Sequence, residues 1–184
     1  MMNAEQRNNV FKSLARLLDE NRAEILKANA ADIDAFDSSD IVLLDRSKVD
    51  DKKIDGMIAA VEKVMAAEDR VGEVISSYTS PDGLKIENRR VPFGTILIIF
   101  EARPDVCIEA AAIALKAGNS ILLKGGKEAR NSNLVLCGLW QKALAEGGGD
   151  TSAVRYLDLS REETQKLIAG RDERIDLIIP RGGD

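Results

Sequence analysis

The chain has no histidine and only two cysteines, Cys107 and Cys137, among its 184 residues. Without histidine, these residues cannot by themselves build a Ser-His-Asp triad or a Cys-His pair. Two cysteines are too few for a disulfide framework, and their spacing fits no common zinc-ligand pattern. The usual nucleophilic and zinc-dependent mechanisms are therefore not expected from these residues alone.

Long apolar runs are also absent. No run approaches the roughly 20 residues that span a bilayer. Residues 1–7 carry charges and lack the apolar core of a signal peptide. We therefore expect a cytoplasmic protein with no membrane partner. The formal net charge of −5 argues against a general nucleic-acid binder, which needs a basic surplus, although a local site for one small anion is compatible with it.

The composition is that of a globular protein, with 45% hydrophobic and 31% charged residues. In residues 4–31, Val10, Phe11, Leu14, Leu17 and Leu18 recur at three- and four-residue spacing, which predicts a helix. A second helix is predicted from residue 54 to about residue 67. The acidic residues 32–40 between them lack calcium-loop spacing, so we interpret them as a solvated connection.

The middle of the chain predicts a β-hairpin. Residues 71–78 and 84–91 flank Ser80-Pro81-Asp82-Gly83, which is typical turn chemistry. One face of this hairpin is fairly polar.

From residue 92 onward, strand and helix patterns alternate. Apolar strands are predicted at residues 95–100, 120–123, 154–157 and 175–179, and helices at residues 106–116, 128–145 and 160–169. This alternation predicts an α/β fold with a parallel sheet and right-handed crossovers. The last strand is followed by a glycine turn and no helix, so we expect this sheet to be incomplete.

The segment Lys124-Gly125-Gly126-Lys127 follows a predicted buried strand and precedes a helix. Ligands bind at this edge of open parallel sheets, and glycines with two lysines suit a phosphate or a ribose. The spacing is not that of a Walker motif. An ordinary glycine turn with solvated lysines explains the pattern equally well.

Two further strand ends carry arginine. Glu101-Ala102-Arg103-Pro104-Asp105 follows the first strand, where Arg103 could bind a carboxylate or phosphate with two hydrogen bonds. A plain helix start, with Pro104 setting the backbone and Asp105 as the cap, fits as well. Arg181-Gly182-Gly183 follows the fourth strand. Together the three strand ends indicate one anion-binding crevice.

Cys107 lies near the start of a predicted helix, where a thiolate is favoured. It is a candidate nucleophile, but no general base is evident and its small apolar neighbours favour packing. Cys137 lies among apolar helical residues and is interpreted as a core residue.

Several motifs resemble those of the γ-glutamyl phosphate reductases, in the aldehyde dehydrogenase superfamily. They cover nearly the whole chain and are Ala28-Asn-Ala-Ala-Asp32, Leu43-Leu-Asp-Arg46 with the helix at residues 53–64, Val91-Pro-Phe-Gly94, Phe100-Glu-Ala-Arg-Pro104, Leu115-Lys-Ala-Gly-Asn119, Leu123-Lys-Gly-Gly-Lys-Glu128 and Ile175-Asp-Leu-Ile-Ile-Pro-Arg-Gly-Gly183.

The resemblance implies an activity and a fold. The activity is the NADPH-dependent reduction of L-glutamyl 5-phosphate to L-glutamate 5-semialdehyde and phosphate, in proline biosynthesis. A cysteine thiolate attacks the acyl phosphate, and NADPH then delivers hydride to the thioester. The fold is the Rossmann-like cofactor domain of aldehyde dehydrogenases. Residues 1–70 would form its N-terminal helical part, residues 71–91 a hairpin that bridges dimers, and residues 92–184 the NADP-binding part.

The residue types and their spacing predict no metal site, and the resemblance implies roles for individual residues. Lys124 would hold the adenosine ribose, with Gly125, Gly126 and Lys127 nearby. The cofactor cleft would be lined by Arg181, Gly182 and Gly183, and the floor of the active site by Glu101, Arg103 and Pro104.

Neither cysteine matches the position of the family nucleophile, which lies in a second domain that the sequence lacks. We therefore expect these residues to be inactive alone. Because the predicted sheet is incomplete and a crevice needs both walls to bury a ligand, we also expect them to bind NADPH weakly. We expect the full-length enzyme to be a homo-oligomer. Two alternatives stay open: a free-standing nucleotide-binding or regulatory module without catalysis, and a self-sufficient catalyst that uses Cys107.

Overall fold

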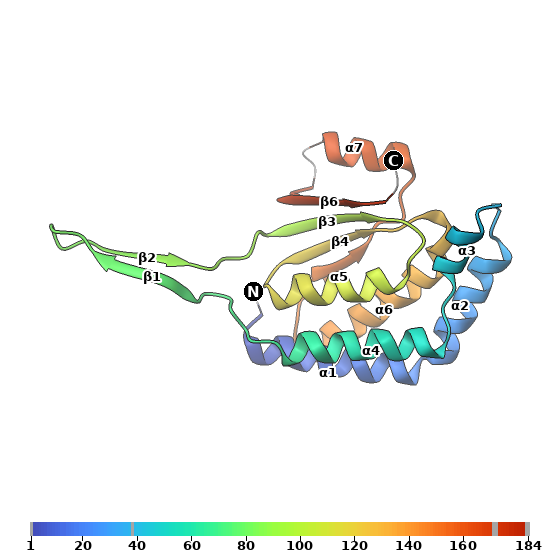
Figure 1. Ribbon diagram of the computed structural model, residues 1–184, viewed down its shortest axis with the longest axis horizontal. Coiled ribbons are helices and arrows are strands. Elements are labelled where there is room, and N and C mark those ends of the chain that lie inside the picture. Colours follow the sequence, from blue (N-terminus) through green and yellow to red (C-terminus); the bar gives the residue numbers. More distant parts are fainter. Residues whose placement is uncertain (1, 38, 171–172, 183–184) are drawn as a thin grey trace.

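The computed structural model describes residues 2–37, 39–170 and 173–182. Four helices come first, followed by a hairpin and then by alternating strands and helices (Figure 1). The elements are α1 (Ala4–Glu20), α2 (Arg22–Asp34), α3 (Ile41–Ser47), α4 (Asp51–Ala66), β1 (Val74–Thr79), β2 (Lys85–Arg89), β3 (Thr95–Phe100), α5 (Asp105–Lys116), β4 (Ser120–Lys124), the 3-10 turn η1 (Lys127–Ala129), α6 (Arg130–Glu146), the 3-10 turn η2 (Thr151–Ala153), β5 (Val154–Tyr156), α7 (Arg161–Ala169) and β6 (Leu177–Arg181).

The sheet has four parallel strands in the order β5-β4-β3-β6. The chain moves outward from β3 to β5 and then crosses to the far side of β3 to form β6. The strand order therefore reverses between β3 and β6, as in the Rossmann fold. This topology confirms the predicted α/β fold with a parallel sheet.

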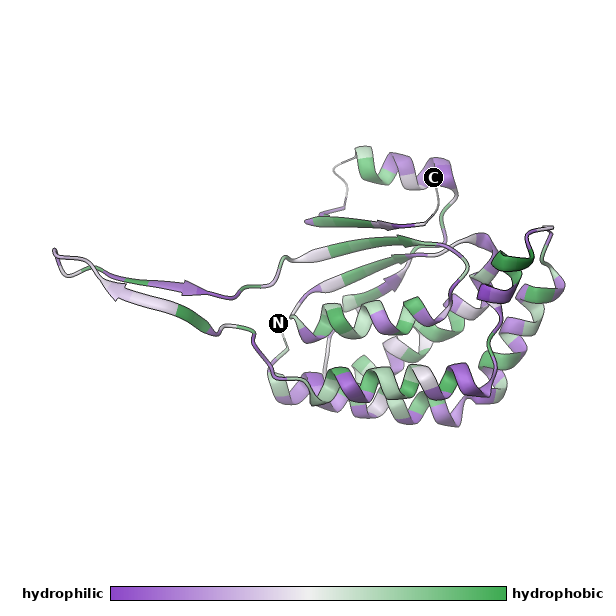
Figure 2. Ribbon diagram, viewed as in Figure 1, coloured by the Kyte–Doolittle hydropathy of each residue, from purple (hydrophilic) through white to green (hydrophobic). Residues whose placement is uncertain are grey.

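The core lies mainly between this sheet and the helices on one of its faces (Figure 1). Hydrophobic residues run along β3, β4 and β6 (Figure 2). Helices α5 and α6 cover the sheet, and α1 and α4 form a further layer. Phe11 of α1 meets Trp140 of α6 edge to face, with ring centroids 6.3 Å apart. The indole nitrogen of Trp140 donates a hydrogen bond to the carbonyl oxygen of Cys107 at 3.2 Å.

Two N-terminal predictions differ from the structure. The single helix predicted over residues 4–31 is two helices, α1 and α2, separated at Asn21. The Asn21 side-chain amide donates to the carbonyl oxygen of Leu17 at 2.7 Å, an interaction that competes with regular helical backbone bonding. The connection after α2 contains an unpredicted helix, α3, whose first turn is capped by Asp40. The second predicted helix is confirmed as α4, which begins at Asp51.

The acidic stretch at residues 32–40 is not entirely a solvated connection, because Asp32 is buried with an exposed fraction of only 4%. Its carboxylate accepts hydrogen bonds from the backbone N–H of Asn131 at 2.9 Å and from the N–H and hydroxyl of Ser132 at 2.8 and 2.7 Å. Ala129, the residue before α6, has no side chain that could cap this helix. Asp32 therefore caps α6 from a distant part of the sequence.

Asn29, also buried, extends this network. Its amide nitrogen donates to the carbonyl oxygen of Ser47 at 2.8 Å and to the Ser132 hydroxyl at 3.1 Å, and its oxygen accepts from the N–H of Val49 at 2.7 Å. Helices α2, α3 and α6 are thereby joined through buried hydrogen bonds. Across the described ranges, no three side chains of the metal-binding kinds form a site for an ion.

The predicted hairpin is confirmed as β1 and β2, which extend away from the sheet and its helices (Figure 1). In its turn, Gly83 has φ +90 and the N–H of Leu84 donates to the Ser80 hydroxyl. The hairpin leaves several apolar side chains exposed, namely Val74, Ile75, Tyr78, Leu84 and Ile86. Of the helices that the structure describes, none is both long and apolar enough to cross a bilayer.

Replacing Asp32 by alanine tests the cap on α6. The substitution leaves two backbone N–H groups and one hydroxyl without their buried acceptor, so the free energy of unfolding should fall by about 2–4 kcal/mol. Urea unfolding followed by circular dichroism measures the change. Asp37→Ala is the matched control, because Asp37 is exposed and should alter stability by less than about 0.5 kcal/mol. Equal stability of the two variants would contradict the proposed cap.

Candidate functional site

The register of the parallel strands brings the predicted site residues to one edge of the sheet. Lys124 at the end of β4 pairs with Ile99 of β3, and Arg181 at the end of β6 pairs with Phe100. The turns that follow β3, β4 and β6 therefore begin side by side. The prediction that three basic strand ends lie at one edge agrees with this register.

The turn after β4 packs closely on α6. The Lys124 ammonium donates to the carbonyl oxygen of Gly125 at 2.6 Å. Gly125 is buried, and a Cβ there would lie 2.3 Å from the side-chain nitrogen of Asn133. Glycine at this position is therefore required by packing. Asn133 is itself fully buried, and its side-chain nitrogen and oxygen have no hydrogen-bond partner within the described residues. Lys127 is exposed.

The end of β5 adds a carboxylate that sequence reasoning missed. Asp158 accepts from the Arg130 Nε at 2.8 Å, which links the loop after β5 to the start of α6. The hydrogen bond from Arg130 lowers the pKa of Asp158. This pairing carries no local sequence signal, because the two residues lie 28 positions apart.

The turn after β3 begins α5. Pro104 is the residue before the helix, with φ −57 and ψ −32. The predicted role of Asp105 as the cap is wrong, because Asp105 lies within the first turn and pairs instead with the Arg103 guanidinium at 2.6 Å. Arg103 and Glu101 are exposed, whereas Pro104 is buried. The hydrogen bond to Asp105 raises the pKa of Arg103.

A cavity of about 450 Å³ lies between the ends of β3 and β6. It brings together Glu101 and Arg103 from the first turn with Arg181 and Gly182 from the last, and it also includes Arg46. Sequence reasoning did not place Arg46 in the site; its only signal was the Leu43-Leu-Asp-Arg46 motif. A Cβ at Gly182 would lie 2.9 Å from a carboxylate oxygen of Glu101. Gly183, also a predicted site residue, lies outside the described residues.

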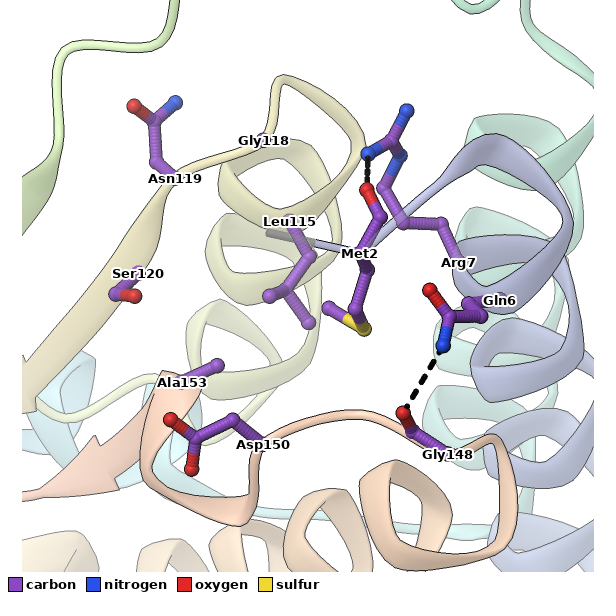
Figure 3. Close-up of a pocket in the computed structure, with 10 residues that line it drawn as sticks. All are labelled: Met2, Gln6, Arg7, Leu115, Gly118, Asn119, Ser120, Gly148, Asp150 and Ala153. Atoms are coloured by element: carbon purple, nitrogen blue, oxygen red, sulfur yellow. Dashed lines mark hydrogen bonds between the residues drawn. The ribbon is translucent and has the colours of Figure 1, made fainter.

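A different cavity, of about 270 Å³, lies at the opposite edge, where β4 and β5 begin (Figure 3). Several of its polar groups already have partners. Arg7 pairs with Asp69 and donates to the carbonyl oxygen of Met2, and Gln6 donates to that of Gly148 at 3.3 Å. Asn119 accepts from the N–H of Gly94. These interactions join α1 to the starts of the strands, so we assign this cavity a structural role.

Both cysteines are buried. Cys107 has no exposed surface, and burial raises its thiol pKa well above the usual value. Burial likewise raises the pKa of Cys137 to about 11. The predicted thiolate at the start of α5 is therefore not favoured, because the cost of burying its charge exceeds the stabilisation that the helix N-terminus provides. The core interpretation of Cys137 is confirmed.

Thiol alkylation tests this interpretation. Because a raised pKa leaves little thiolate at pH 8, iodoacetamide should modify neither cysteine in the folded chain and both in urea. Mass spectrometry counts the added groups, and Ser77→Cys on the exposed strand β1 provides a reactive control. Modification of Cys107 in the folded chain at the rate of the control would contradict its burial.

The sequence pattern of the aldehyde dehydrogenase family matches residues 1–183. A γ-glutamyl phosphate reductase from Persephonella marina is 39% identical over 180 residues, covering 97% of this chain and 40% of that protein. The γ-glutamyl phosphate reductase structure from Thermotoga maritima has a TM-score of 0.91 at 40% identity, covering 99% of this chain and 44% of that one. The corresponding enzyme from Saccharomyces cerevisiae has a TM-score of 0.87 at 29% identity, covering 100% of this chain and 47% of that one.

The chain thus spans less than half the length of these relatives. The family pattern nevertheless covers nearly all of its residues, and its fold matches the solved structures of these relatives. The chain belongs to the aldehyde dehydrogenase family.

Proposed function

We propose that the protein is a reductase that converts L-glutamyl 5-phosphate to L-glutamate 5-semialdehyde with NADPH, and that these residues supply the cofactor-binding part. The observation that carries the proposal is the convergence of lysine and arginine with glycine at the carboxyl ends of β4 and β6. The names of the γ-glutamyl phosphate reductases that match this chain support the choice of substrate.

The aldehyde dehydrogenase family implies a nicotinamide cofactor, and the turn after β4 fits one. Only a glycine at position 125 lets the backbone lie against Asn133, which keeps this turn close to α6. Lys124 and Lys127 place two ammonium groups at the turn, a donor set suited to a ribose hydroxyl and a phosphate. When bound, the cofactor supplies a hydride to the substrate.

NADPH carries a 2′-phosphate that NADH lacks, and the charge at this turn favours it. The Lys124 ammonium is held over the turn by the carbonyl oxygen of Gly125. Lys127 is exposed and makes no ion pair with any described residue. We assign Lys124 to the adenosine ribose, Gly125, Gly126 and Lys127 to its surroundings, and Arg181, Gly182 and Gly183 to the rest of the cleft.

The nucleophile is a separate question. Cys107 and Cys137 are buried, and the pKa of each thiol is raised. We therefore propose that the thiolate of the reaction comes from residues other than these 184, and that this chain alone does not turn over. Within it, residues 1–70, 71–91 and 92–184 are the proposed helical part, bridging hairpin and NADP-binding part.

Fluorescence titration with NADPH tests the cofactor assignment. We expect weak but saturable binding, with NADPH preferred over NADH because of its additional phosphate. Lys124→Ala should weaken NADPH binding roughly tenfold, as expected for the loss of one charge-assisted hydrogen bond. Lys142→Ala, which removes an exposed lysine from α6, should leave the affinity unchanged.

Two outcomes would contradict the assignment. The first is an absence of saturable NADPH binding to the wild-type chain. The second is an equal effect of the two lysine substitutions, because a general charge effect does not depend on position. Urea unfolding of each variant shows that the fold is intact.

The hairpin supports an oligomer. Its strands are exposed on both faces, and a two-stranded hairpin is marginally stable in water by itself. At its base, Val91 and Phe93 are largely exposed beside an apolar groove of about 570 Å³. We propose that the hairpin and its base contact a second copy of the protein.

Sedimentation velocity tests this contact. Ile75→Asp adds a charge to the exposed strand β1 and should weaken self-association at least tenfold. Ala30→Asp adds the same charge at an exposed position of α2 and should not change it. If the wild-type chain sediments as a monomer at the highest attainable concentration, the hairpin contact is wrong.

A further inference from the structure

We propose that the cavity between the ends of β3 and β6 binds the phosphoryl group of the acyl phosphate through Arg46, Arg103 and Arg181. The proposal rests on the proposed function, because it names how the same site recognises its substrate. It adds Arg46 to the site, and it assigns Arg181 to the substrate phosphoryl group in addition to the cofactor cleft.

The three arginines come from three separate elements. Arg46 lies in the last turn of α3, Arg103 follows β3, and Arg181 ends β6. They line one cavity of about 450 Å³, whose apolar part includes Phe100 and Val106. A guanidinium binds a phosphoryl group through two parallel hydrogen bonds, which makes arginine the preferred residue for this anion.

The charge of the cavity favours an anion. Its lining holds three arginines and a single carboxylate, that of Glu101. Arg103 pairs with Asp105 through Nε and Nη2, which fixes the guanidinium and leaves Nη1 outside the pair. Neither Arg46 nor Arg181 forms a salt bridge with another described residue. The lining therefore keeps an excess of positive charge that a phosphoryl group would neutralise.

The two sides of the cavity differ in their backbone. Dinucleotides approach a glycine-rich turn closely, because glycine leaves the backbone N–H groups open. Gly182 provides such a turn on the β6 side of the cavity, whereas the β3 side has Ala102 and Pro104, and proline has no N–H to donate. We therefore infer that the cofactor phosphates keep to the glycine turns after β4 and β6, and that Arg46 and Arg103 hold the phosphoryl group of the substrate together with Arg181.

The position of the cavity within the sheet supports a ligand. The strand order reverses between β3 and β6, and ligands of open α/β sheets bind outside the carboxyl ends of the strands at that point. This crevice is bounded on one side by Glu101 and Arg103 and on the other by Arg181 and Gly182.

Titration of the 184-residue chain with inorganic phosphate, followed by ³¹P NMR, tests the proposal. Arg46→Gln should weaken phosphate binding about fivefold to tenfold, because one charged donor is lost. Arg46→Lys should retain part of the affinity, since lysine keeps the positive charge but lacks the planar guanidinium that donates two parallel hydrogen bonds. Arg89→Gln is the matched control: like Arg46→Gln it removes an exposed arginine, but from the distant hairpin, and it should have no effect.

Repeating the titration with saturating NADP⁺ separates the two possible sources of the phosphoryl group. We expect phosphate binding to persist, and the affinity of Arg46→Gln for NADP⁺ to equal that of the wild type. Loss of phosphate binding in NADP⁺, together with weaker NADP⁺ binding by Arg46→Gln, would assign the cavity to the cofactor and overturn the proposal.

Three other results would also overturn it: no saturable phosphate binding to the wild type, unchanged binding by Arg46→Gln, or an equal loss in Arg89→Gln. Failure of the cofactor assignment is distinguishable from these results. In that case NADPH binding is absent while phosphate still binds and depends on Arg46.

Discussion

The hydrogen-bonded register of the parallel strands is the constraint on which the site depends. Ile99 opposite Lys124 and Phe100 opposite Arg181 fix where the three turns begin. Strand β3 is apolar and buried on both faces, with Leu97 on one face and Ile96 and Ile98 on the other. The alternation of its side chains therefore does not by itself select the register, which the hydrogen bonds to β4 and β6 hold in place. The same pairing sets the spacing of the strand ends.

A second constraint comes from the helical layer. Asp32 caps α6 immediately after the glycine turn, and Asn29 binds the backbone at Ser47, next to Arg46. One buried network in α2 thus supports both the turn proposed to hold the cofactor and the helix that supplies Arg46. Because its members are joined to one another, displacement of α2 would move both sides of the site. The N-terminal helices therefore support the proposed site as well as the core.

Much of the fold was predictable because its signals are local. Continuous apolar runs identified β3 and β4, and the Ser80-Pro81-Asp82-Gly83 turn identified the hairpin. The strand-end position of Lys124 and Arg181 followed from the alternation of strands and helices. What could not be predicted depends on partners distant in sequence. Asp32 acts on residues about 100 positions away, and the pattern around it resembles that of any solvated acidic connection. Arg46 likewise reaches its cavity only through the packing of α3.

Cys107 shows how two electrostatic effects compete at one position. A helix start stabilises a thiolate, which made the residue a reasonable candidate nucleophile. The Cys107 side chain is nevertheless fully buried between α5 and α6. The cost of removing the thiolate charge from water exceeds the stabilisation by the helix N-terminus, so burial raises the pKa of the thiol. The arginines and lysines at the strand ends are in the opposite situation, since they are wholly or partly exposed to solvent. The two cysteines are therefore poorly suited to supply an ionised nucleophile, which supports the proposal that these residues bind and position while the covalent step takes place elsewhere.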